Sequence, residues 1–236
     1  MRSARRIHAV LFDAAGTLIR VAEPVGETYT RLARRFGVSL PASRIEEAFR
    51  RVLRAAPPMV FAGESPAAIP AYERAWWREV VRGAFRAADG TVRFTDFDAF
   101  FDGLFAHYAR PAAWEILPGA SGALAALQAA GLRTGVVSNF DGRLPGLLEG
   151  LGLAAGLEVV VLPSHARAAK PDPRIFTCAL AALGLPAAAA VYVGDDAAQD
   201  VAGAEGAGLH AIHVGALATL GALPEAIAAL EEETPQ

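Results

Sequence analysis

The chain has 236 residues, of which 53% are hydrophobic and 20% are charged, and its formal net charge is −3. This length suits one large domain or a domain with a sizeable insertion, and a weakly acidic chain without a basic stripe gives no reason to expect a nucleic-acid partner. No run reaches the roughly 18 apolar residues of a membrane helix, and the run behind the N-terminal charges is too short for a signal peptide, so we expect a cytoplasmic protein that does not bind membranes.

Short apolar runs alternate with amphipathic stretches along most of the chain. The runs predict strands at 7–12, 132–137, 157–162, 189–193 and 209–214, with helices at 119–130, 142–151, 174–183 and 197–207. Continuous apolar strands separated by helices are typical of a parallel sheet that is buried on both faces. We therefore predict an α/β fold with a Rossmann-like, five-stranded parallel sheet and helices on both faces.

Residues 21–110 interrupt this alternation. They contain no convincing strand, most of the aromatic residues, and four helical patterns at 25–36, 42–55, 66–87 and 95–108. We predict an α-helical domain inserted at 21–110. The core domain would then consist of residues 1–20 and 111–236.

The use of lysine is unusual. Of the 22 basic residues, Lys170 is the only lysine, and the others are arginine. Arginine serves wherever a positive charge is sufficient, whereas lysine offers a compact ammonium with freely rotating donors. We interpret Lys170 as a residue that places a point charge in a pocket beside a phosphate or a carboxylate.

Polar clusters follow the predicted strands. They are 13–17 (Asp-Ala-Ala-Gly-Thr), Ser138 with Asn139, Lys170, and 194–196 (Gly-Asp-Asp) with Asp200. Each cluster alone is also compatible with a turn or a helix cap. Because ligands bind at the carboxyl ends of parallel strands, we expect Asp13, Thr17, Ser138, Lys170 and Asp195 to converge in one cleft.

In this order, the clusters resemble the four motifs of the haloacid dehalogenase-like hydrolase superfamily, and the resemblance covers the whole chain. The matching segments are 12–18 (FDAAGTL), 137–139 (VSN), 170–176 (KPDPRIF), and 193–196 (VGDD) with 200–204 (DVAGA). The helical insertion lies where this superfamily has its cap domain. The segments 24–29 (PVGETY), 76–77 (WW) and 138–141 (SNFD) are similar to the haloacid dehalogenase-like hydrolase domain-containing protein 3 group.

The resemblance implies roles for these residues. Asp13 would be a nucleophile that forms an aspartyl-phosphate, with Lys170 as its catalytic partner. Thr17, Ser138, Asn139 and Lys170 would bind the phosphate of a small phosphorylated molecule. Mg²⁺ would be held by Asp13, the backbone carbonyl of Ala15 and Asp195, with Asp196 and Asp200 in support. Nothing in the sequence indicates the oligomeric state.

Ala15 departs from the phosphatase pattern. Phosphatases of this superfamily have a second aspartate at this position, which protonates the leaving group and later activates water. Alanine does neither, and general acid–base catalysis contributes about 10²–10⁴ in rate. We therefore expect a Mg²⁺-dependent phosphatase with weakened acid–base catalysis, in which Asp141, His165 or a substrate group replaces the missing acid.

Two other interpretations stay open. A 2-haloacid dehalogenase needs no acid because the halide leaves unprotonated, but those enzymes work without metal, and Asp195, Asp196 and Phe176 match the phosphatases better. A member without useful catalysis would bind a phosphorylated ligand or a protein partner. Phosphonoacetaldehyde hydrolases also have alanine at this position, but their chemistry requires a cap lysine, which residues 21–110 lack.

Overall fold

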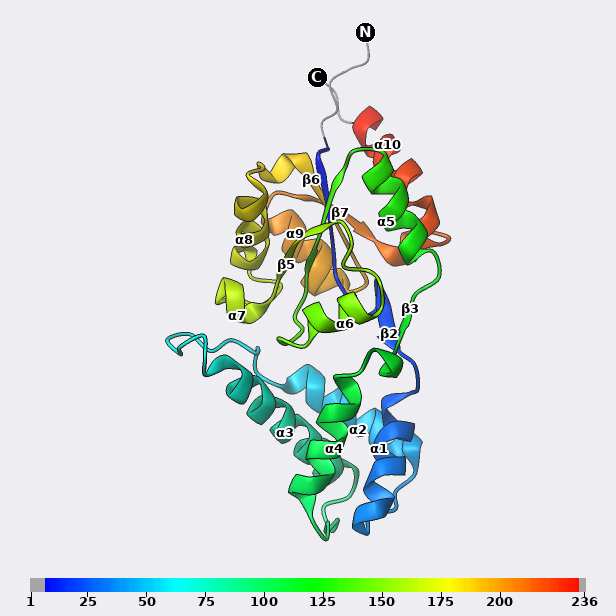
Figure 1. Cartoon of the computed structure of the whole chain (residues 1–236), viewed down its shortest axis with the longest axis vertical. Helices are drawn as coiled ribbons and strands as arrows, with labels where there is room; N and C mark the ends of the chain where they lie inside the picture. The colour runs from blue at the N-terminus through cyan, green and yellow to red at the C-terminus, as the bar shows by residue number, and fades with distance from the viewer. Residues whose placement is uncertain (1–6, 234–236) are drawn as a thin grey trace. The chain divides into compact units, whose positions relative to one another are not determined.

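A computed structural model of the chain describes residues 7–233 and divides into two compact units (Figure 1). The core unit contains the described residues up to Arg20 and the chain from Ile116 onward, and the helical unit is Val21–Glu115. The boundary at residue 110 in the sequence-based division thus lies inside the helical unit. None of the helices in the described part of the chain is long and apolar enough to cross a membrane.

The core unit is built on a parallel sheet of five strands in the order β5-β4-β1-β6-β7. The strands are β1 (Ala9–Phe12), β4 (Arg133–Val137), β5 (Leu157–Val161), β6 (Ala190–Gly194) and β7 (His210–His213). All four side chains of the central strand β1 are fully buried, as expected for a parallel sheet covered on both faces. The predicted parallel α/β sheet is therefore confirmed.

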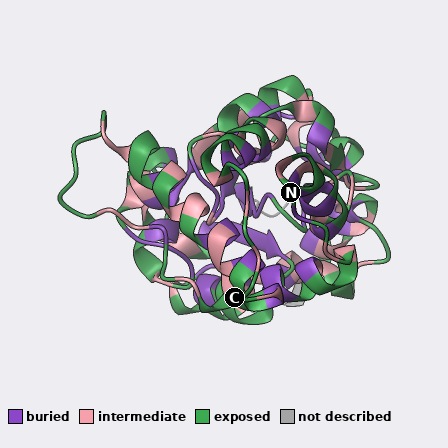
Figure 2. Ribbon diagram, turned by 90° about the horizontal axis from the view of Figure 1, so that it is seen from below, coloured by how far each residue is buried: buried purple, intermediate pink, exposed green. Residues whose placement is uncertain are grey.

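Helices cover both faces of this sheet. They are α5 (Ala120–Ala129), α6 (Leu144–Gly150), α7 (Pro163–Ala166), α8 (Pro173–Leu183), α9 (Gly203–Gly206) and α10 (Leu223–Glu233), with a π-helical turn, η4 (Ala197–Ala202), ahead of α9. Short 3₁₀ turns η3 (Ala187–Ala189), η5 (Val214–Ala216) and η6 (Leu220–Ala222) complete the unit. α8 and α9 lie on one face of the sheet and α5 and α10 on the other (Figure 1). Figure 2 colours the ribbon by burial, with buried segments in purple. The buried residues that join α8 to the strands include Phe176 and Tyr192, whose rings are in contact.

The helical unit has its own apolar core. Its helices are α1 (Val25–Ala33), α2 (Ala42–Ala55), α3 (Ile69–Ala88) and α4 (Phe97–Tyr108), with 3₁₀ turns η1 (Arg34–Phe36) and η2 (Pro111–Ala113). Aromatic residues fill the core, and Phe85, for example, packs edge-on against Phe94 and Phe100. Trp76 and Trp77 are both partly buried against this core. The four predicted helices are present, with ends that differ by a few residues.

A short two-stranded ribbon lies where the chain leaves the core fold and returns to it. It consists of β2 (Ile19–Val21) and β3 (Trp114–Ile116). The backbone N–H of Leu117 donates to the carbonyl of Leu18 at 2.9 Å. The sequence predicts no strands here, because three residues are too few for a hydrophobic period to be recognised.

Candidate active site

The site lies at the carboxyl end of the core sheet. Strand β1 has β4 and β6 as its neighbours, so the residues that follow these strands, Asp13, Ser138 and Asp195, meet at one edge. The backbone N–H of Asp13 donates to the carbonyl of Val193 at 2.9 Å, which extends the sheet pairing beyond the end of β1. Ser138 is buried at the end of β4.

The turn after β1 brings Thr17 against Asp195. The carbonyl of Ala14 accepts hydrogen bonds from the N–H groups of Leu18 and Ile19, each at 2.9 Å, which fold the chain back on itself. The Thr17 hydroxyl lies 3.3 Å from Asp195 Oδ1. Ala15, at the position of the missing acid, is exposed.

Lys170 is buried between carboxylates. Its ammonium Nζ lies 2.8 Å from Asp13 Oδ1, 2.5 Å from Asp200 Oδ1 and 3.0 Å from the Tyr192 hydroxyl. Burial lowers the pKa of Lys170, but the charges of Asp13 and Asp200 outweigh burial, so the pKa is raised above its ordinary value. The side chain of this single lysine therefore points toward Asp13 and is buried from solvent.

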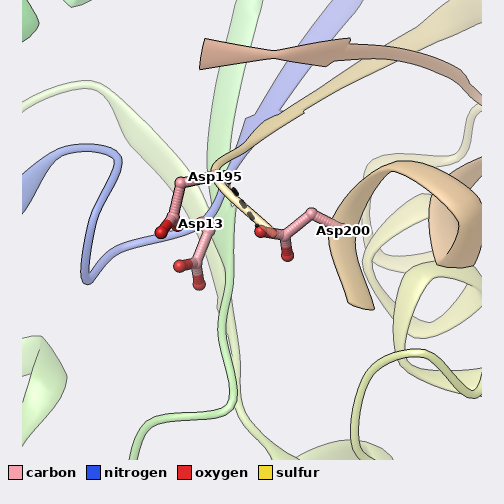
Figure 3. Close-up of side chains that lie close together, drawn as sticks. All are labelled: Asp13, Asp195 and Asp200. Carbon is pink, nitrogen blue, oxygen red and sulfur yellow. Dashed lines mark hydrogen bonds between the residues drawn. The ribbon is translucent and has the colours of Figure 1, made fainter. Parts of the chain in front are cut away.

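Asp200 contacts both Lys170 and the turn that follows β6. It lies in the π-helical turn η4, a rare form of helix that is frequent at functional sites. Its Oδ2 accepts the N–H groups of Asp195 and Asp196, each at 3.0 Å (the bond from Asp195 is dashed in Figure 3). Since Oδ1 accepts from Lys170, both oxygens are engaged, and Asp200 orients its neighbours.

Three carboxylates gather at one point. Oxygens of Asp13, Asp195 and Asp200 lie within 4.8 Å of one another (Figure 3). Burial, followed by the negative charges of Asp13 and Asp200, raises the pKa of Asp195. A divalent cation would relieve this repulsion, and carboxylate oxygens are the ligands that Mg²⁺ prefers. The residues therefore fit a Mg²⁺ site, with Asp13 and Asp195 as the natural side-chain ligands because Asp200 is already engaged.

Asn139 connects the end of β4 to Lys170 and to Gln199 in η4. Its Oδ1 accepts the backbone N–H of Lys170 at 2.8 Å, and its Nδ2 donates to the Lys170 carbonyl at 3.0 Å and to Gln199 Oε1 at 2.9 Å. The family resemblance gives Asn139 a role in phosphate binding, whereas in the structure its amide holds the backbone of Lys170. Asp196 Oδ1 similarly accepts the N–H groups of Ala198 and Gln199, at 2.9 and 2.8 Å, and caps η4.

The two candidates for a replacement acid have different surroundings. Asp141 is buried and paired with Arg143, whose guanidinium nitrogens lie 2.8 and 2.6 Å from its two oxygens. Both oxygens of Asp141 are thus already engaged by one guanidinium. His165 is exposed on α7.

Tyr192 and Gln199 contact the site residues, although their sequence positions did not predict it. Tyr192 lies within the fully buried strand β6, where its position looks like ordinary core. A tyrosine in such a run does carry a signal, because a buried hydroxyl needs a hydrogen-bond partner. Gln199 is exposed, and its residue type carries no such signal.

One class of hydrolases combines a parallel sheet, an inserted helical unit and a lysine–carboxylate cluster. The chain belongs to the haloacid dehalogenase-like hydrolases, whose family model matches residues 7–208. It is 36% identical over 198 residues to haloacid dehalogenase-like hydrolase domain-containing protein 3 of Danio rerio, covering 81% of this chain and 78% of that protein. It is also 43% identical over 107 residues to a phosphoglycolate phosphatase of Rhodospirillum rubrum, covering 44% of each chain.

Solved structures share the fold. The chain is similar to a haloacid dehalogenase-like phosphatase from Thermococcus onnurineus, with a TM-score of 0.63, 24% identity, and coverage of 94% of this chain and 98% of the other. It is equally similar to the L-2-haloacid dehalogenase of Xanthobacter autotrophicus, with a TM-score of 0.64, 23% identity, and coverage of 94% and 83%. Phosphatases and dehalogenases thus share this architecture.

Proposed function

We propose that the chain is a Mg²⁺-dependent phosphatase of a small phosphorylated molecule that acts through an aspartyl-phosphate on Asp13. The observation that carries the proposal is the contact of the Asp13 carboxylate with the buried Lys170 ammonium, at 2.8 Å, beside the second carboxylate of Asp195. A paired lysine and carboxylate cluster supplies positive charge for a phosphoryl group and ligands for a cation. The partial match to a phosphoglycolate phosphatase supports the same reaction class.

Each side chain has a defined task in this reaction. An Asp13 oxygen attacks phosphorus, the bond from phosphorus to the ester oxygen breaks, and the leaving alkoxide takes up a proton. Water then attacks the phosphorus of the aspartyl-phosphate, which regenerates Asp13 and releases inorganic phosphate. Lys170 offsets negative charge on the phosphoryl group, and the Thr17 and Ser138 hydroxyls hold its oxygens. Bound Mg²⁺, on Asp13, Asp195 and the Ala15 carbonyl, would supply further charge neutralisation.

Proton transfer is the weak step. Ala15 has no titratable group, and Asp141 is tied to Arg143. Substrates whose leaving group is stable without a proton should therefore react best, and alkyl esters worst. The substrate itself, or water, would supply the proton for the latter.

A second candidate is cleavage of a carbon–halogen bond. Ala15 favours it, because halide departs without a proton, and the dehalogenase fold is shared. The acidic cluster of Asp13, Asp195 and Asp200 argues against it. The single ammonium of Lys170 leaves these three carboxylates with a net negative charge that a metal would offset, whereas the attack on carbon needs no metal.

Hydrolysis of p-nitrophenyl phosphate, with and without Mg²⁺, tests the proposal, because its leaving group needs little protonation. We expect Mg²⁺-dependent release of nitrophenol that is abolished by Asp13→Asn, since an amide is a very poor nucleophile. Activity that persists in Asp13→Asn would contradict the aspartyl-phosphate. No hydrolysis of p-nitrophenyl phosphate, together with halide release from 2-chloropropionate, would favour the dehalogenase. No reaction with either substrate would favour a ligand-binding role.

A further inference from the structure

The ammonium of Lys170 has a third partner that none of the four motifs includes. An ammonium has three N–H donors. Two of them face Asp13 Oδ1 and Asp200 Oδ1, and the third neighbour is the hydroxyl of Tyr192, at 3.0 Å. Tyr192 is fully buried in β6.

The hydroxyl is oriented to accept this hydrogen bond. Its single proton has two possible acceptors, the carbonyl of Val137 at 2.7 Å and Asp200 Oδ1 at 3.3 Å. The shorter distance assigns the proton to Val137, which leaves the hydroxyl lone pairs for Lys170. Burial and the charges of Asp13 and Asp200 raise the pKa of Tyr192, so the hydroxyl keeps its proton.

We propose that Tyr192 is a positioning residue, whose hydroxyl holds the Lys170 ammonium between Asp13 and Asp200 by accepting its third N–H. A lysine stem is flexible, and a buried N–H without a partner is costly. The Tyr192 hydroxyl, anchored on the end of β4 through Val137, removes both problems. This inference rests on the proposed function only for its effect on catalysis.

The single lysine provides the readout. Since Lys170 is the only lysine in the chain, protein labelled with lysine that carries ¹⁵N at the side-chain nitrogen gives one lysine ammonium resonance. We compare the exchange of its protons with water in the unaltered chain and in Tyr192→Phe. Phenylalanine keeps the ring that packs edge-on against Phe176 at 5.0 Å and removes only the hydroxyl. We expect exchange about tenfold faster or more, the size of one hydrogen bond to a charged group.

Phe176→Leu is the matched control. It disturbs the packing around the Tyr192 ring but keeps the hydroxyl. Slow exchange in this control together with fast exchange in Tyr192→Phe supports the proposal. Equal acceleration in both variants would show loosened packing instead, and unchanged exchange in Tyr192→Phe would overturn the proposal directly.

Two further measurements keep the test decisive. The first applies if Tyr192→Phe does not fold. In the unaltered chain, a nuclear Overhauser effect between the lysine ammonium and the ring protons of one of the four tyrosines supports the contact, and its absence overturns it.

The second applies if the variant is active. We then expect a lower kcat for p-nitrophenyl phosphate, with KM less affected. The lysine resonance needs no turnover, so a lack of hydrolysis would contradict the proposed function alone.

Discussion

Two glycines allow the carboxylates of the site to approach the strand ends. Gly16 has a φ of 99°, and a Cβ there would overlap the carboxylate of Asp195. A Cβ at Gly194 would overlap the side chain of Asp200. Glycine tolerates positive φ and close approach, which any larger residue would prevent. At the scale of single residues, the site therefore needs glycine at positions 16 and 194 as much as it needs Asp13 and Lys170.

Ala15 yields the prediction at this scale. If turnover is limited by the missing acid, Ala15→Asp supplies a proton donor and acceptor at an exposed position of the turn. We expect the rate to rise by about one to a few powers of ten at saturating Mg²⁺, and to rise more for alkyl phosphates than for p-nitrophenyl phosphate, because alkoxides need protonation most.

Ala15→Asn is the control for this substitution, because it adds the same volume without a titratable group. A similar gain in Ala15→Asn would mean that shape and not proton transfer limits the rate. Equal gains for both substrate classes in Ala15→Asp would show that another group already supplies the proton.

At the scale of elements, helix termini organise the loops of the site. Asp172 is the N-cap of α8, two residues after Lys170, and its Oδ1 accepts the backbone N–H of Arg174 at 2.9 Å. The guanidinium of Arg174 also lies 2.7 Å from Asp172 Oδ2. The side-chain hydrogen bond from Arg174, and then its backbone N–H, lower the pKa of Asp172 to about 2. The start of α8, and with it the loop of Lys170, is thus held by an ionised cap.

This cap predicts a pH dependence of stability. Because the pKa is lower in the folded state, ionised Asp172 stabilises the fold above its ordinary pKa of 3.8, and this contribution is lost as the pH falls to about 2. Asp172→Asn keeps a capping side chain but has no charge to lose. We expect the unaltered chain to have the higher Tm near neutral pH, and the Tm difference from Asp172→Asn to disappear by pH 2. A difference that stays constant with pH would contradict this assignment.

At the scale of the whole molecule, the carboxylate cluster couples cation binding to stability. Asp13 and Asp195 come from different strand ends and repel one another, and their approach is fixed only in the folded chain. A cation that binds the folded state and not the unfolded chain stabilises the fold, by about 2.7 kcal/mol at a hundredfold excess over its Kd.

We therefore expect Mg²⁺ to raise the Tm by about 5 °C or more at that excess, measured against NaCl of equal ionic strength. Asp195→Asn should abolish most of this rise, because it removes one ligand and much of the repulsion. If Mg²⁺ does not change the Tm, or raises it equally in Asp195→Asn, this cluster is excluded as the metal site. The measurement needs no substrate and is independent of turnover.

The sequence by itself determined the class of fold and most of the residue types at the site. The alternation of apolar runs and helices is a local pattern, and it predicted the parallel sheet, the helical insertion and Asp13 at a strand end. The single lysine identified Lys170 because composition, which needs no structure, made it exceptional.

Only the tertiary structure decided which groups meet. Strand order places β1 between β4 and β6, and no local pattern encodes that order. It brings the Tyr192 hydroxyl to the Lys170 ammonium, and the Asn139 amide to the Lys170 backbone, across more than twenty and thirty residues of chain. It also forms the ribbon of β2 and β3, whose strands are too short to carry a period. Hydrogen-bond partners that lie far apart in sequence depend on how the strands pair, and this pairing is a property of the folded chain alone.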